Sequence, residues 1–414
     1  MELRAEKYKQ TEIGLIPSDW EVKMLCDLTP QNRKFGIVDG PFGSNLKTIH
    51  YRKSGIPIIT SGYVTNGYFF ADEYLYVDID KFKQEKRSAV NPGDIVMAKI
   101  GERCGASAIL PSNHQEGILS GNALKISIDE NKYVNSLIWQ ILYNLYLSGK
   151  LKILRTTGAQ PALSIANLKK FQISLPPTLT EQTAIATALS DADALISSLE
   201  KLIAKKRNIK QGAMQKLLQP KEGWEVKKLG EVLEKIVGGG TPSRSNNEFW
   251  GDEIPWVTVK DFTTFNPLIT QEYITKKGLE NSASHLIPKG ILVTPTRMGL
   301  GKAVIYYVDV SINQDLKALF PSKYLNTLYL YFWFQNNSEL IEKMGSGSTV
   351  MGISLNELRN IDFYLPSMEE QTRIATILSD MDAEIAALQT KLEKYKKVKL
   401  GMMQNLLTGK IRLV

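Results

Sequence analysis

With 414 residues, 43% of them hydrophobic and 23% charged, the chain has the composition of a globular protein and is long enough for two or three domains. No apolar run is long enough to span a bilayer, the polar start Met1-Glu2-Leu3-Arg4 is not a signal peptide, and the two cysteines lie far apart, which together favour a cytoplasmic protein. The 51 Lys+Arg against 43 Asp+Glu give a formal charge of +8, which favours a polyanionic partner without establishing one, and 3 His with 2 Cys argue against a metal site.

The first part of the chain, between Trp20 and Leu175, is expected to fold as a mixed α/β unit. Strands are predicted at residues 56–60, where Ile-Pro opens an apolar run, and at residues 93–97, ahead of a glycine-bounded turn. A helix rich in leucine and aromatic residues is predicted at residues 137–147. A serine-containing loop and a short strand are expected to close the unit.

A long helical arm follows this unit, and a second arm closes the chain. Each arm starts with a capping box, Thr-Leu-Thr-Glu from Thr178 and Ser-Met-Glu-Glu from Ser367, directly after proline. The stretch that begins at Glu181 returns at Glu370, 189 residues later, and the echo continues without a gap through the rest of the arm. A duplication of this length predicts a molecule with approximate two-fold symmetry.

Within each arm, apolar residues recur at alternating spacings of four and three residues. A seam held this long favours a supercoiled helix pair over a helix in a globular core. At 1.5 Å per residue, each arm is roughly 50 Å long. The two predicted coiled-coil seams match position by position and consist chiefly of Ile185, Leu189, Ile196, Leu199 and Ile203 in the first arm and Ile374, Leu378, Ile385, Leu388 and Leu392 in the second.

The expected partner of each arm is the other arm of the same chain. Two tandem units related by a pseudo-two-fold axis would pair these helices antiparallel, and a homodimeric coiled coil between two chains is the alternative. Lys206, Lys210 and Lys399 interrupt the seam. Their long stems are expected to leave the ammonium groups in water.

The second globular unit, between Trp224 and Leu365, repeats the landmarks of the first in the same order. Strands are predicted at residues 254–258 and 290–293, and a helix at residues 325–334. The loops between these landmarks differ, as expected for one scaffold with two recognition surfaces. The predicted domains are residues 1–177, a helical arm at 178–220, residues 221–366 and a helical arm at 367–414.

The sequence lacks the motifs of a catalytic site. It has no Asp/Asn-Pro-Pro-aromatic tetrapeptide, which an amino-methyltransferase needs to hold its target base, and no Gly-x-x-x-x-Gly-Lys-Ser/Thr loop. The pairs Asp191/Asp193 and Asp380/Asp382 are unsuited to one metal ion, because residues two apart on a helix point to different sides. They are interpreted as polar-face residues or as contacts for a partner protein. The run Gly238-Gly239-Gly240 is interpreted as a tight turn, with a phosphate-binding loop as the alternative.

Over nearly its whole length the chain resembles the DNA specificity (S) subunits of type I restriction–modification systems. One specific part of the resemblance is a Leu-Pro followed shortly by Glu-Gln-Thr-x-Ile-Ala-Thr-x-Leu-Ser-Asp-x-Asp at the head of each arm. The other is Gly239-Gly240-Thr241-Pro242-Ser243 ahead of Ile254-Pro255-Trp256-Val257-Thr258. The first unit departs from this second pattern, with Gly40-Pro41-Phe42-Gly43-Ser44 in its place.

The resemblance implies an α+β fold with two target-recognition domains, each recognising one half of a split double-stranded DNA site. It also implies that the two helical regions form an antiparallel ruler and dock two methyltransferase (modification) subunits, which restriction (motor nuclease) subunits join. S-adenosylmethionine, ATP and Mg²⁺ are then expected in the partner subunits and not in this chain.

If the chain binds DNA, its affinity should come from phosphate contacts and its specificity from base edges. Arg103 and Arg297 rank highest among the candidates, because they lie in glycine-bounded turns that correspond between the units. The candidates are Ser44, Asn45, Lys47, Arg52, Tyr63, Lys99 and Arg103 in the first unit and Ser243, Arg244, Lys260, Arg297 and Lys302 in the second.

Two other functions remain compatible with this sequence. One is a coiled-coil protein–protein adaptor without DNA binding, which would show no salt-dependent affinity for DNA. The other is the specificity half of a fused restriction–methylation enzyme, against which the missing methyltransferase motifs count. For a DNA ruler, an arm of roughly 50 Å would correspond to about 15 base pairs.

Overall fold

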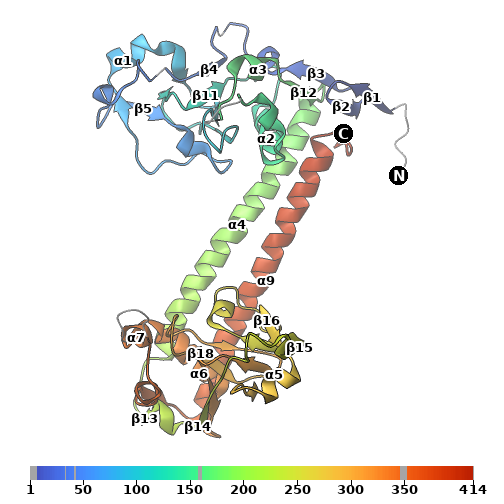
Figure 1. Ribbon diagram of the computed structural model, residues 1–414. Helices are drawn as coiled ribbons and strands as arrows, with labels where there is room; N and C mark the ends of the chain where they lie inside the picture. Colours follow the sequence, from blue (N-terminus) through green and yellow to red (C-terminus); the bar gives the residue numbers. More distant parts are fainter. Residues whose placement is uncertain (1–6, 33, 42, 157–160, 346–351, 414) are drawn as a thin grey trace. The chain divides into compact units, whose positions relative to one another are not determined.

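The computed structural model of the chain describes residues 7–32, 34–41, 43–156, 161–345 and 352–413. The chain divides into two compact units. Unit 1 comprises residues 1–198 and 392–414, and unit 2 comprises residues 199–391. Each unit contains one α/β domain together with part of each of two long helices, α4 (Leu179–Leu217) and α9 (Met368–Leu406) (Figure 1).

Unit 1 contains two sheets, with strand orders β6-β5-β10-β7 and β4-β11-β8-β9. Strands β5 and β10 run parallel, and the other neighbouring pairs in these sheets are antiparallel. The strands are short: β4 (Ile37–Asp39), β5 (Ile56–Ile59), β6 (Tyr76–Val77), β7 (Ala89–Val90), β8 (Ile95–Ala98), β9 (Ser107–Ile109), β10 (Gly117–Leu119) and β11 (Ala123–Ile126).

Helices and two small sheets complete unit 1. The main helices are α1 (Ile79–Gln84), α2 (Asn135–Leu147) and α3 (Ile165–Lys170). The small sheets pair β1 (Tyr8–Thr11) with β2 (Gly14–Pro17) and β3 (Glu21–Met24) with β12 (Gln172–Leu175).

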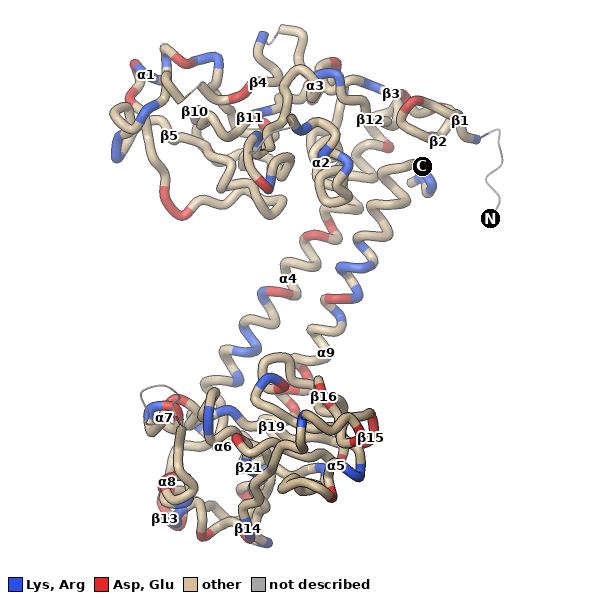
Figure 2. The backbone as a smooth tube through the Cα atoms, in the orientation of Figure 1, with Lys and Arg blue, Asp and Glu red and all other residues tan. Residues whose placement is uncertain are grey.

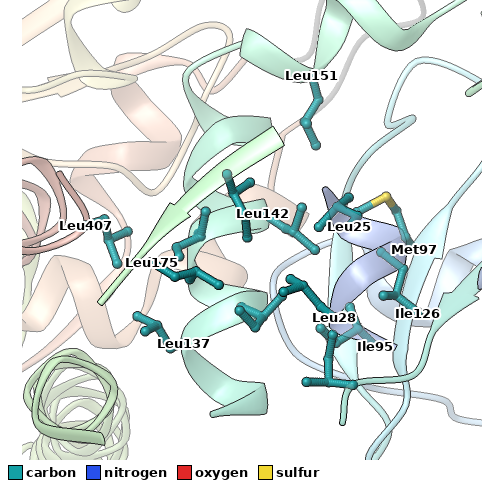
Figure 3. Packing of buried hydrophobic residues seen from close by; sticks show 14 of the residues in the cluster. Leu25, Leu28, Ile95, Met97, Ile126, Leu137, Leu142, Leu151, Leu175 and Leu407 are labelled. Carbon is teal, nitrogen blue, oxygen red and sulfur yellow. The ribbon is translucent and has the colours of Figure 1, made fainter. Parts of the chain in front are cut away.

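The core of unit 1 joins its sheet to both long helices. Strand β8 reads Ile-Val-Met-Ala and is buried along its whole length, because side chains pack on both of its faces. Figure 3 shows Met97 and Ile95 of this strand beside Leu25 and Leu28, in the buried cluster that also contains Leu142 of α2. The same buried cluster contains Leu189 of α4 and Leu406 of α9, so the start of α4 and the end of α9 are part of the domain core.

Unit 2 repeats the topology of the two four-stranded sheets of unit 1 and has no counterpart of the β1–β2 pair among the described residues. Its sheets have the orders β14-β21-β18-β19 and β16-β15-β20-β17, with β15 and β20 parallel. A further pair joins β13 to β22, as β3 joins β12 in unit 1. The strands are β13 (Glu225–Lys228), β14 (Leu233–Gly238), β15 (Trp250–Val257), β16 (Glu272–Ile274), β17 (Leu286–Ile287), β18 (Leu292–Pro295), β19 (Val304–Ile305), β20 (Val310–Ile312), β21 (Leu316–Pro321) and β22 (Asp362–Leu365).

The main core of unit 2 packs around an aromatic helix. Helix α6 (Thr327–Asn336) buries Tyr329, Phe332 and Trp333, which share a cluster with Ile374 and Leu378 from the start of α9. Met214 from the end of α4 belongs to the same cluster. The shorter helices are α5 (Lys276–Glu280), α7 (Ser338–Lys343) and α8 (Leu355–Arg359).

The two long helices pair antiparallel within each unit, which confirms the predicted fold class. The distribution of charged residues along the two helices explains why they pair antiparallel. In the part of α4 that belongs to unit 1 the charged residues are all acidic, whereas the part in unit 2 is mainly basic, and α9 changes from mainly acidic to mainly basic in the same way (Figure 2). Antiparallel pairing therefore sets an acidic segment beside a basic one in both units.

Two reciprocal ion pairs show this arrangement in detail. In unit 1, Lys399 Nζ lies 2.5 Å from Asp193 Oδ1. In unit 2, Lys210 Nζ lies 2.6 Å from Asp382 Oδ1. Both lysines and both aspartates are repeat equivalents, 189 residues apart. The expectation that these lysine ammonium groups stand in water was therefore wrong, and Asp193 and Asp382 are contacts between the helices.

The predicted seam residues lie on the inner faces of these helices. Lys206, which also interrupts the seam, pairs with Glu384 at 2.6 Å. Within the described residues, no helix is long and apolar enough to cross a membrane. Ile185, Leu189, Leu199, Ile203, Ile374, Leu378, Ile385 and Leu392 are buried, and Ile196 and Leu388 are half-buried.

The head of each long helix is fixed by a buried glutamine. In unit 2, Gln371 Oε1 accepts a hydrogen bond from the backbone N–H of Asn326, and Gln371 Nε2 donates to the carbonyl oxygens of Tyr324 and Pro366. In unit 1, Gln182 bonds in the same way to the N–H of Val134 and the carbonyl of Pro176. Each glutamine thus joins the first turn of a long helix to the loop before the domain's aromatic helix.

The capping boxes form only in part. Thr178 Oγ1 accepts from the N–H of Glu181, and Ser367 Oγ accepts from the N–H of Glu370, both at 3.3 Å. The glutamate carboxylates, however, bind elsewhere in their own units. Glu181 pairs with Arg412 and Glu370 with Lys221, because a full charge close by competes with the backbone N–H.

The serine-containing stretches that were expected to be loops are short helices. Ser164 Oγ caps α3 by accepting from the N–H of Asn167. Ser354 caps α8 and forms a capping box with Glu357. The second of these has the Ser-x-x-Glu spacing that predicts a helix start.

Candidate nucleic-acid interface

The equivalent sheets of the two units allow their surfaces to be compared residue by residue. The pairing of β8 with β11 matches that of β18 with β21, so that Ala98 corresponds to Pro295. The next residue, Lys99 or Thr296, donates its backbone N–H to the carbonyl of Asn122 or Asp315. Beyond this point the two units carry different side chains on the same backbone frame.

At this edge, unit 1 has a cluster of three charges. Lys99 Nζ donates to Asp39 Oδ2 at 2.6 Å, and Arg87 donates to Asp39 Oδ1 at 2.7 Å. The Asp39 and Lys99 side chains are 12% and 18% exposed, whereas half of Arg87 faces solvent. Asp39 therefore holds two cations at the end of the sheet, and Arg87 is the one accessible to a phosphate.

At the corresponding edge, unit 2 has a polar cleft of about 520 Å³. Arg297 Nη1 lies 3.9 Å from Asp315 Oδ1, and the Arg297 side chain is 66% exposed. Lys317 Nζ donates to the carbonyls of Gln314 and Leu316. Burial lowers the pKa of the Lys317 ammonium, although Asp315 opposes this effect. An incoming phosphate would favour the charged form of this lysine.

Arg103 and Arg297 do not occupy equivalent positions, although their turns correspond. Short β-bridges join Ile100 to Ala162 and Arg297 to Gly352, so Arg297 matches Ile100. The turn in unit 1 is one residue longer before the next matching strand pair. Arg103 lies in that longer part, is exposed and has no side-chain partner among the described residues. The turn was predicted from its glycines, but the register needed the structure.

Arg244 is stacked on an aromatic ring and paired with a carboxylate at the surface of unit 2. Its guanidinium lies 3.7 Å from the centroid of the Trp250 ring and forms two hydrogen bonds with Glu272, at 2.5 and 2.9 Å. These bonds lower the pKa of Glu272 and raise that of Arg244. Stacking and pairing reduce the freedom that a mobile arginine would lose on binding.

The remaining candidates in unit 1 fall into two groups. Ser44, Asn45 and Lys47 are exposed in one surface segment. Arg52 donates to Asp78 at 2.9 Å and to two nearby carbonyls, which restrains it. Tyr63 packs against Phe69 and Tyr74 and donates to the carbonyl of Glu73, so its contacts are those of a structural residue.

The remaining candidates in unit 2 are exposed side chains. Ser243 Oγ lies 2.9 Å from Ser245 Oγ, in the loop that precedes Trp250. Lys260 follows β15, and Lys302 follows the turn that contains Arg297. The pKa of Glu272, which is lowered chiefly by Arg244, is lowered further by the charge of Lys260, and Lys302 is exposed.

The glycine run of unit 2 is explained by close packing. A Cβ on Gly239 would lie 1.8 Å from the carbonyl oxygen of Ile312, and one on Gly40 in unit 1 would lie 2.0 Å from that of Ser120. Both glycines therefore allow one sheet to approach the other. The carbonyl of Gly240 accepts from Trp256 Nε1 and Ser284 Oγ. Gly238 ends β14, and Gly239 and Gly240 follow it without a turn, so the tight-turn interpretation was wrong and the glycines serve close packing of the sheets.

Several residues at these edges were not among the candidates. Asp39 and Arg87 are 48 residues apart in sequence, and nothing local links them. Lys317 stands out in hindsight, because it is a lysine in the apolar strand β21. Among the described residues, no three His, Cys, Asp or Glu side chains gather as a metal site.

Comparison with known proteins agrees with this architecture. The sequence pattern of the type I restriction modification DNA specificity domain matches residues 17–211 and again residues 221–397. The chain is 26% identical to the type I restriction enzyme MjaVIII specificity subunit of Methanocaldococcus jannaschii, over 99% of this chain and 97% of that protein. It is 31% identical to the MjaIX specificity subunit of the same organism, over 45% of this chain and 44% of that protein.

A solved structure shows the same fold. The type I restriction–modification S subunit from M. genitalium superposes with a TM-score of 0.57 at 15% identity, over 97% of this chain and 99% of that one. The duplicated α/β domain with paired helices, together with the twice-matched sequence pattern, defines the class of DNA specificity subunits. The chain belongs to the type I restriction modification DNA specificity family.

Proposed function

We propose that this chain is the non-catalytic subunit that recognises DNA in a type I restriction–modification complex, with each unit recognising one half of a bipartite site. The observation that carries the proposal is that the two units share one backbone scaffold but have different charged residues at the matching edges of their sheets. The strand orders of the two units are the same, whereas Asp39, Arg87 and Lys99 in unit 1 are replaced by a different charged set in unit 2. Two units that recognised the same DNA sequence would not need different charged residues at these edges.

Arginines beside carboxylates fit sequence-specific DNA binding better than a uniformly positive surface would, because such a surface attracts any phosphate backbone. Exposed Arg87, Arg103, Arg244 and Arg297 offer donors to phosphates and to guanine edges. Carboxylates hydrogen-bond to the guanidinium groups of Arg87 and Arg244, and Asp315 lies 3.9 Å from that of Arg297. A carboxylate also disfavours phosphate at random positions, which limits non-specific binding.

The proposal places catalysis in partner subunits. Two methyltransferase subunits would dock on the helical regions, and restriction subunits would join them. S-adenosylmethionine, ATP and Mg²⁺ would be bound by those partners, and the complex would act on DNA in the cytoplasm. The missing methyltransferase and nucleotide-binding motifs in this sequence support that division.

The direct test is to map methylated bases genome-wide in cells with the intact gene and in cells that lack it. A bipartite sequence that loses methylation on deletion is the expected result. Binding of the assembled complex to that sequence should also weaken steeply with salt, because phosphate contacts release counterions. A DNA affinity that depends neither on salt concentration nor on sequence would favour the protein–protein adaptor.

The helices provide a second test. Inserting seven residues at repeat-equivalent positions of α4 and α9 keeps the phase of the seam and adds roughly 10 Å. We expect the mapped half-sites to stay unchanged and the spacer between them to grow by about three base pairs. An unchanged spacer would show that the helices do not set the distance.

A further inference from the structure

Met298 adopts a backbone conformation that disfavours its side chain. Its φ angle is 52°, and it is the one non-glycine residue with positive φ among the described residues. In this left-handed region an L side chain is strained, because Cβ comes too close to the following carbonyl oxygen. For a long apolar residue such as methionine, this conformation needs an explanation.

The surroundings of Met298 impose the conformation. Before it, the backbone of Arg297 is bridged to Gly352, and the N–H of Ile353 donates to the carbonyl of Thr296 at 3.0 Å. After it, Leu300 is buried with 5% exposure. Because both ends of the turn are fixed, the φ angle of Met298 between them is constrained.

At the equivalent position of its turn, unit 1 has a glycine. The bridged residues Ile100 and Arg297 correspond, so the next residues, Gly101 and Met298, correspond as well. Gly101 has a φ of 96°. Glycine adopts this conformation without strain, and unit 1 uses it. The methionine in unit 2 is thus retained at a position where glycine would suit the backbone better.

The Met298 side chain does not stabilise the core. It is 55% exposed and belongs to none of the buried clusters of unit 2. It stands directly beside Arg297, whose side chain is 66% exposed at the rim of the polar cleft. A strained, exposed apolar side chain next to an exposed arginine is arranged for contact with something outside the domain.

We propose that Met298 is a specificity-determining residue that contacts the 5-methyl group of a thymine in the half-site bound by unit 2. This inference rests on the proposed function. In B-DNA the major groove displays the thymine methyl, the apolar group that an apolar side chain can recognise there, together with the guanine acceptors that suit arginine. Met298 and Arg297 are therefore a matched pair for adjacent base pairs.

The shape of the element supports the major groove. The turn joins β18 and β19, an antiparallel hairpin in which Leu292 pairs with Ile305 and Val293 with Val304. On its other side β18 pairs with β21, so the hairpin is the edge of a four-stranded sheet, and the turn at its end is the part that would enter a groove. The major groove, about 12 Å wide, admits such an element more readily than the minor groove, about 6 Å wide. The minor groove also lacks the thymine methyl.

The test uses the assembled complex of the full-length chain with its methyltransferase subunits, and the target sequence found by methylation mapping. Each thymine of both strands is replaced in turn by deoxyuridine, which removes only the methyl group. For the unaltered chain we expect affinity to fall about fourfold at one thymine, the value of one buried methyl group. Met298→Gly should remove this sensitivity, and Met298→Leu should retain it.

Two controls separate recognition from folding. Leu268→Ala changes another exposed apolar residue of unit 2 and should keep the deoxyuridine sensitivity. Met298→Gly should melt at the same or a higher temperature than the unaltered chain, because the backbone strain is relieved.

Three results would overturn the inference: no sensitive thymine for the unaltered chain, retained sensitivity in Met298→Gly, or a lower melting temperature for that variant. If the unaltered complex does not prefer the mapped target over a scrambled sequence, the proposed function fails instead.

Discussion

Removing Asp193 should loosen the helix pair of unit 1 more than removing its partner. Asp193→Ala leaves the Lys399 ammonium, whose side chain is 18% exposed, without its carboxylate at 2.5 Å. Lys399→Met removes the charge and leaves an apolar side chain of similar length at a seam position. The asymmetry follows from the cost of an unpaired, partly buried charge.

The magnitude follows from the burial of the pair. Exposed pairs contribute about 0–1 kcal/mol, and breaking a fully buried pair costs about 3–5 kcal/mol. Because the Asp193 side chain is 41% exposed, this pair lies between those limits, closer to the first. We expect Asp193→Ala to cost about 1–2 kcal/mol, Lys399→Met to be nearly neutral, and the double variant to resemble Lys399→Met.

The assay is native-state hydrogen exchange on the full-length chain, which measures opening locally and does not require the two units to unfold together. About 1.4 kcal/mol corresponds to tenfold faster exchange. Amides at the start of α4 should show this change in Asp193→Ala. The more exposed Lys206–Glu384 pair is the matched control, and Glu384→Ala should change exchange less than about threefold. Equal effects of Asp193→Ala and Lys399→Met would refute the reasoning.

Two further predictions concern unit 2. Gln371→Met should cost about 3 kcal/mol in urea unfolding, because it leaves three backbone groups near the head of α9 without partners, whereas exposed Gln389→Met should be neutral. Below about pH 4.5, protonation of Glu272 should weaken its contact with Arg244, because a lowered carboxyl pKa gives stability that is present above 4.5 and lost as pH falls through the folded-state pKa. Trp250 fluorescence should report this acid transition, and Glu272→Gln should abolish it; a transition that persists in the variant has another origin.

The long helices could be predicted because their signals are local and repeated. Proline, a capping serine or threonine and a heptad seam fix where each helix begins and which face is buried. Even the direction of pairing was available, since acidic residues gather in the first half of each arm and basic residues in the second. The ion pairs of Lys210 and Lys399 follow directly from that distribution.

The recognition edges could not be predicted in the same way. Arg87 and Asp39 meet only because η5 (Lys86–Ser88) lies beside β4. The turn around Arg297 was recognised from its glycines, but its match with unit 1 depends on bridges to Gly352 and Ala162. Contacts of this kind depend on register between distant strands, which a glycine spacing does not specify.

Because the two units share one scaffold, comparing them separates residues that the fold requires from residues that it does not. Features that both units share, such as Gln182 and Gln371 at the helix heads, are required by the scaffold, because they recur although the surrounding loops have diverged. Features that differ on the same backbone frame are not required by folding. The strain at Met298 is the sharpest case, because Gly101 shows that the fold itself prefers glycine there. A residue that opposes its own backbone, yet has no role in the core, is explained by what it contacts outside the protein.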